Sequence, residues 1–112
     1  MGNVYFPLGR KKEAITAYKK AIELEPDYVF ACNNLGVAYL SLNEYDKPLT
    51  LFKKAIEISL DYPKPYYNIS LTYYKMKKYE ETLKYCKKAM ELNYEVDEEF
   101  IKLLNSHRRK VE

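Results

Sequence analysis

The segment Lys53-Lys54-Ala55-Ile56-Glu57 has one near copy before it and another after it, both at the same interval along the chain. The copies are Lys19-Lys20-Ala21-Ile22-Glu23 and Lys87-Lys88-Ala89-Met90-Glu91. Tyr39 and Tyr73 keep the same spacing. Self-similarity at one fixed period is the signature of a repeat architecture, in which each unit buries its apolar face against its neighbours. The sequence therefore predicts an array of 34-residue units.

Two helical patterns alternate within each unit. Leu35, Tyr39 and Leu42 share one helix face, and Leu49, Phe52 and Ile56 share another, at the spacing of an amphipathic helix. Glycine is scarce, and Lys, Glu, Leu and Ala are frequent, which also favours helices. The pattern predicts an all-α chain with helices of about Val29 to Leu42, Tyr45 to Ser59, Lys64 to Met76 and Tyr79 to Leu92.

Proline and acidic residues mark the ends of these helices. Pro63 and Pro65 suit a first helical turn, where backbone N–H groups have no intrahelical partner. Pro26 is expected to end the preceding helix. Asp97 begins a last helix, predicted over residues 97–110, with acidic groups at the positive end of its dipole. Pro7 predicts that the helix of residues 2–8 is short or irregular.

The second unit reads Cys32-x2-Leu35-Gly36-x2-Tyr39, then Pro48-x3-Phe52 and Ala55. This pattern resembles the tetratricopeptide repeat (TPR), a 34-residue helix–turn–helix unit. The resemblance implies a right-handed superhelical stack of helix–turn–helix repeats, a TPR-like solenoid, with a C-terminal capping helix. Its parts would be a truncated first repeat at residues 1–28, repeats at 29–62 and 63–96, and the cap at 97–110. Small residues such as Gly36 would let neighbouring helices approach, and Phe52 would fill the gap.

Catalysis is not expected from this sequence. Its single histidine, His107, has no nucleophile placed beside it, and Cys32 and Cys86 fall on core positions of the repeat. No glycine-rich phosphate loop is present, so we expect neither a cofactor nor a metal. A net charge of +3 is too small to predict nucleic-acid binding.

The sequence also indicates a cytoplasmic protein without a membrane partner. No apolar run approaches the roughly 18 residues that span a bilayer, and no signal peptide is visible. Two cysteines without metal-type spacing fit a reducing compartment.

The resemblance implies a protein–protein interaction module. In this family the first helix of each pair lines a concave groove that binds peptides, and the positions between the core residues face that groove. Amides there would pair with peptide backbone, and aromatic rings would hold apolar side chains. The expected peptide-binding residues are Asn3, Phe30, Asn33, Asn34, Val37, Lys64, Tyr67, Asn68, Leu71, Tyr74 and Lys75, with Leu40, Ser41, Ile101, Lys102 and Asn105 as further candidates.

Two alternatives remain open at this point. Some TPR domains clamp the C-terminal carboxylates of heat-shock chaperones with two lysines, two asparagines and an arginine. Asn3, Asn34 and Lys64 match that pattern, but Asn68 stands at the arginine position and the first lysine has no counterpart. The other alternative is homo-oligomerisation through the incomplete first repeat, whose apolar residues would be poorly covered.

Overall fold

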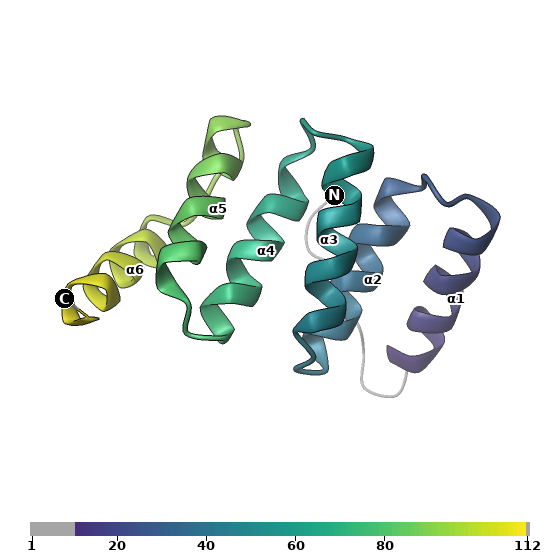
Figure 1. Ribbon diagram of the computed structural model, residues 1–112, viewed down its shortest axis with the longest axis horizontal. Helices are drawn as coiled ribbons and strands as arrows, with labels where there is room; N and C mark the ends of the chain where they lie inside the picture. The colour runs from purple at the N-terminus through teal and green to yellow at the C-terminus, as the bar shows by residue number, and fades with distance from the viewer. Residues whose placement is uncertain (1–10, 112) are drawn as a thin grey trace. The chain divides into compact units, whose positions relative to one another are not determined.

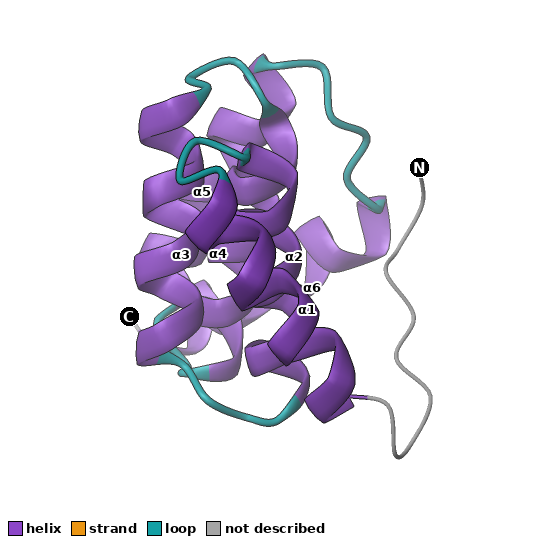
Figure 2. Cartoon of the chain, turned by 90° about the vertical axis from the view of Figure 1, so that its right-hand side faces the viewer, coloured by secondary structure: helices purple, strands orange, loops and turns teal. Residues whose placement is uncertain are grey.

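The computed structural model describes residues 11–111 of the 112-residue chain, and side chains are described through His107. These residues form helices joined by short loops, without a strand (Figure 2). The helices are α1 (Lys11–Leu24), α2 (Val29–Ser41), α3 (Asp46–Ile58), α4 (Pro63–Lys75), α5 (Tyr79–Glu91) and α6 (Glu98–Val111). The predicted helices from Val29 onward are confirmed, while the prediction for residues 2–8 falls outside the described part.

The chain divides into two compact units, Met1–Leu60 and Asp61–Glu112. In the first unit α1 packs against α2, and α2 packs against α3. These three helices run antiparallel in succession, so the α1–α2 loop and the end of α3 lie at the same end of the unit (Figure 1). In the second unit α4 packs against α5, and α5 contacts α6.

Short-range hydrogen bonds fix where the helices begin and end. Pro63 is the first residue of α4, and the Oδ1 atom of Asp97 accepts a hydrogen bond 3.0 Å long from the Glu99 N–H to cap α6. Asn43 and Lys77, each two residues beyond the end of α2 or α4, have φ angles of 62° and 64°. The next N–H bonds five residues back in each case, for example Lys78 to the Tyr73 carbonyl at 2.9 Å, which forms a Schellman motif.

The core of the first unit pairs a small residue on one helix with a larger one on the next. In the first unit Gly36 lies against Phe52, which is fully buried. A methyl group on Gly36 would lie 2.8 Å from two ring carbons of Phe52, so only glycine leaves room for the ring. The repeat period puts Ser70 and Cys86 at the corresponding places in the second unit, and both are buried.

Candidate functional site

On α2 the predicted binding positions divide into two stripes. Phe30, Asn34, Val37 and Ser41 follow one another at i, i+4, i+7 and i+11, and all four are exposed or half-buried. Asn33 lies about 70° further round the helix, towards the packed side, and only 3% of its surface is exposed. Asn33 therefore belongs to the interior of the first unit, and the helix offers its surface through the first stripe.

The same division occurs on α4, at the equivalent positions of the next repeat. Lys64, Asn68, Leu71 and Lys75 repeat the exposed stripe of α2 in the same order, and each is half-buried or exposed. We call these two sets of four residues, Phe30, Asn34, Val37 and Ser41 on α2 and Lys64, Asn68, Leu71 and Lys75 on α4, the open stripes. Within them the hydroxyl of Ser41 donates to the Ala38 carbonyl over 2.6 Å, and the Asn68 carbonyl accepts from the Thr72 hydroxyl over 2.8 Å.

The two predicted tyrosines of α4 lie outside its open stripe and pack against α6. The ring of Phe100, on α6, lies 6.2 Å from the ring of Tyr67 and 5.2 Å from that of Tyr74, both in edge-to-face geometry. Tyr67 also meets Tyr94 at 4.8 Å. The rings of Tyr67 and Tyr74 therefore attach α6 to α4. The spacing of the sequence indicated a peptide-binding position for both and did not indicate this packing.

His107 completes this aromatic cluster at the far end of α6. Its ring stacks on Tyr79 at 4.5 Å with an interplanar angle of 7°, and it meets the edge of Tyr74 at 6.1 Å. Burial raises the pKa of the Tyr67 phenol, and the neighbouring Tyr94, Cys86 and Asp97 act in the same direction. The cluster therefore packs α6 against α4 and partly buries this phenol.

The remaining predicted positions lie outside the open stripes. Asn3 falls outside the described residues. On α6, Ile101 is half-buried, and Lys102 and Asn105 are exposed. Leu40 is buried, as is Asn33 earlier in the same helix.

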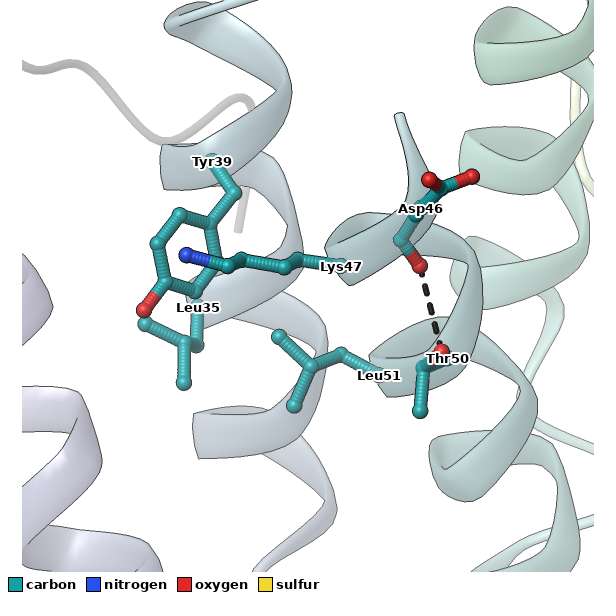
Figure 3. A pocket seen from close by; sticks show the side chains of 6 residues that line it. All are labelled: Leu35, Tyr39, Asp46, Lys47, Thr50 and Leu51. Atoms are coloured by element: carbon teal, nitrogen blue, oxygen red, sulfur yellow. Dashed lines mark hydrogen bonds between the residues drawn. The ribbon is translucent and has the colours of Figure 1, made fainter. Parts of the chain in front are cut away.

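A pocket of about 370 Å³ lies between α2 and α3, and the sequence did not point to it (Figure 3). The Lys47 ammonium stands 4.9 Å from the centre of the Tyr39 ring, a cation–π contact. Thr50 donates a hydrogen bond of 3.1 Å to the Asp46 carbonyl at the rim. Leu35 and Leu51 line its apolar part, so the pocket suits an apolar group rather than a reaction.

The charge of α2 and α4 sets them apart from the other helices. Helix α2 has no Asp, Glu, Lys or Arg, and α4 has only Lys64 and Lys75. Helices α1, α3 and α5 each carry several charges of both signs. The two helices that bear the open stripes therefore present amides, apolar groups and cations, with no carboxylate of their own.

Neither cysteine is placed for nucleophilic chemistry. Cys32 and Cys86 are buried thiols, and burial raises the pKa of each. Asp27 adds to the effect at Cys32, while Lys54 opposes it. No group of three or more His, Cys, Asp or Glu side chains could hold a metal ion within the described residues. None of the helices over residues 11–111 combines the length and apolar character needed to cross a bilayer.

These features define a helical repeat protein, and comparison with known families assigns it. Sequence profiles described as TPR repeat match residues 2–43 and 38–77, and one described as Tetratricopeptide repeat matches residues 63–93. The chain belongs to the tetratricopeptide repeat family. The resemblance seen in the sequence is thereby confirmed, together with the all-helical fold. Proteins of this family are generally scaffolds rather than enzymes.

Solved structures of other TPR proteins resemble this chain. A crystal structure of MamA is 35% identical, with a TM-score of 0.73 over 77% of this chain and 50% of its own. The first TPR of Spaghetti (RPAP3), bound to the HSP90 peptide SRMEEVD, is 22% identical, with a TM-score of 0.80 over 92% of this chain and 81% of its own. This chain spans about half the length of the MamA chains it matches. A comparison with curated proteins gave no significant match. Family membership supports a role in protein–protein interaction, and the solved structures share the fold.

Proposed function

We propose that this chain binds a segment of a partner protein through the open stripes of α2 and α4. The observation that carries the proposal is the repetition of one surface pattern on both helices. An asparagine stands at the second place of each stripe, as Asn34 and Asn68, and an apolar side chain at the third, as Val37 and Leu71. Amides can hold the backbone of an extended peptide, and apolar groups beside them can receive its side chains.

The charge of the stripes favours an acidic segment. Lys64 and Lys75 are the charged residues of α4, and α2 has none. A carboxylate that approaches these helices meets cations and amides without a like charge on the same helix, and charge-assisted hydrogen bonds are about twice as strong as neutral ones.

A carboxylate clamp for a peptide C-terminus is the more specific form of this proposal. Asn34, Lys64 and Asn68 all belong to the open stripes, and Asn3 would be the fourth member. Because the chain resembles the RPAP3 domain bound to the HSP90 peptide SRMEEVD, that peptide is a suitable probe for the binding of carboxylate-ended peptides. Asn68 supplies an amide where the clamp pattern has an arginine, so the clamp would hold two carboxylates with one cation.

Calorimetric titration with the peptide SRMEEVD tests the preference for carboxylates. We expect binding that weakens when the C-terminus is amidated and that falls by roughly ten- to a hundredfold in Lys64→Ala, since a charged hydrogen bond contributes roughly 1.5 to 3 kcal/mol. Lys53→Ala, an exposed lysine on α3, is the matched control and should bind as the wild type does. Asn68→Arg should strengthen binding, and a failure to do so would remove the clamp.

Capture of partners from the source cell's lysate tests the broader proposal. The double variant Asn34→Ala/Asn68→Ala alters both open stripes and leaves the cores of the units intact. A protein retained by the wild type and lost by the double variant supports the stripes as the binding surface. Equal retention by both baits would move the interaction to another face.

A further inference from the structure

The first unit exposes several large apolar side chains at one end. Leu24 is 74% exposed and Leu60 is 70% exposed, and Tyr28 and Phe30 are also exposed. The Tyr28 and Phe30 rings meet edge to face at 6.2 Å. All four residues lie at the end of the unit where α1 and α3 finish and α2 begins (Figure 1). We call this set, Leu24, Tyr28, Phe30 and Leu60, the edge patch.

The second unit uses the corresponding positions for packing. Leu92 and Tyr94 occupy the places of Leu24 and Pro26 between α5 and α6, and both are half-buried. The Tyr94 ring lies 4.8 Å from Tyr67 and so attaches its loop to α4. The loop between α5 and α6 is therefore packed against α4, whereas the loop between α1 and α2 leaves its apolar side chains exposed at the surface.

Exposed carboxylates occur at the same end of the unit as the edge patch. Glu23, Glu25, Asp27 and Glu57 are all exposed at this end of the unit. Neither α1 nor α3 carries a basic residue in its last turn. This end of the unit therefore exposes apolar side chains and carboxylates together, and it fits a partner that combines an apolar side chain with several cations.

The chain carries a segment of that chemistry in α6. Leu103 is 44% exposed on this helix, and Lys102 beside it is also exposed. The sequence continues as His107-Arg108-Arg109-Lys110, so the second half of α6 holds several cations without a carboxylate up to Val111. Asp97, Glu98 and Glu99 stand at the opposite end of the helix, which would turn that end away from an acidic surface.

We propose that the edge patch binds the second half of α6 of a second copy of this chain. The contact joins two different surfaces, so each copy offers one edge patch and one α6, and association proceeds head to tail. The interface lies apart from the open stripes except for Phe30, which the test variants leave unchanged. The test of self-association is therefore independent of the test of partner binding.

Sedimentation equilibrium of the 112-residue chain tests the proposal. At low salt we expect an average mass that rises above 13.3 kDa with protein concentration. The association should weaken at about 0.5 M salt, where the Debye length is shorter than about 5 Å. Leu24→Ser/Leu60→Ser should remain monomeric. Leu42→Ser is the matched control, because Leu42 is 41% exposed but lies at the other end of the unit, and it should associate as the wild type does.

A charge exchange between the two surfaces identifies the occupant. Glu25→Lys/Asp27→Lys and Arg108→Glu/Arg109→Glu should each lose self-association, and an equimolar mixture of the two should regain it. Circular dichroism confirms that each variant is folded. A monomer at every concentration would overturn the proposal, and so would a mixture that stays monomeric. A dimer that depends on Leu24 and Leu60 but not on the arginines would overturn it as well, and would assign the patch to a symmetric contact instead.

Discussion

A methyl group added at Gly36 tests the packing between α2 and α3 directly. The added carbon would lie 2.8 Å from the Cδ1 and Cζ atoms of Phe52, whereas carbon atoms in contact normally stand about 3.5 to 4.0 Å apart. Phe52 is fully buried, so its ring cannot move into solvent. Overpacking of this kind costs about 1 to 3 kcal/mol.

A second effect of the same substitution has the opposite sign. Alanine is a better helix former than glycine by about 1 kcal/mol, and Gly36 lies inside α2. The net expectation for Gly36→Ala is a loss of about 1 kcal/mol in the free energy of unfolding. In a Phe52→Leu background most of the ring is absent, so the same change should raise stability by up to about 1 kcal/mol.

Urea unfolding followed by circular dichroism measures all four members of this double-mutant cycle. The expected coupling between the two sites is about 1.5 to 2 kcal/mol. The sign reversal is the decisive result, because helix propensity alone would make Gly36→Ala stabilising in both backgrounds. That outcome would refute the view that this glycine is needed for the close approach of Phe52.

Three further predictions concern the last helix, the buried phenols and the thiols. Asp97→Ala removes the side-chain cap of α6 and should lower stability by about 1 kcal/mol, with faster amide exchange in that helix than in α5. Folding raises the pKa of Tyr67, so the folded state holds the phenol proton more tightly. The contribution of this group to stability should therefore be constant below pH about 10 and be lost as the pH rises through the folded pKa, and Tyr67→Phe should make the fall in stability above pH about 10 shallower in unfolding measured against pH. Cys32 and Cys86 should react with a thiol reagent at pH 8 far more slowly than in the urea-unfolded chain, and immediate reaction of either one would contradict its burial.

The helices could be predicted because their signals are local. The repeat period and the proline positions place the ends of α2 to α6 within one residue of those observed. The separation of the candidate binding positions into exposed and buried ones could not be predicted in the same way. Asn33 and Asn34 are adjacent in the sequence and both are amides, and only the packing of the first unit makes one interior and the other accessible.

Long-range packing also explains the other differences. Tyr67 and Tyr74 have the spacing of surface positions, and their contact with Phe100 depends on where the last helix lies, beyond the whole of α5 in the chain. The pocket beside Tyr39 is lined from two helices, and Lys47 of the following helix lies over the tyrosine ring, a contact that no periodicity in the sequence indicates.

The attachment of α6 through aromatic rings determines how much of the α4 surface is accessible. While α6 is in place, the contacts of Phe100 and His107 occupy Tyr67 and Tyr74, and α4 offers its open stripe alone. If α6 swings out, the two tyrosines join that stripe and widen the footprint with large amphipathic rings. A partner with aromatic or apolar side chains that displaced α6 would therefore gain contact area on α4.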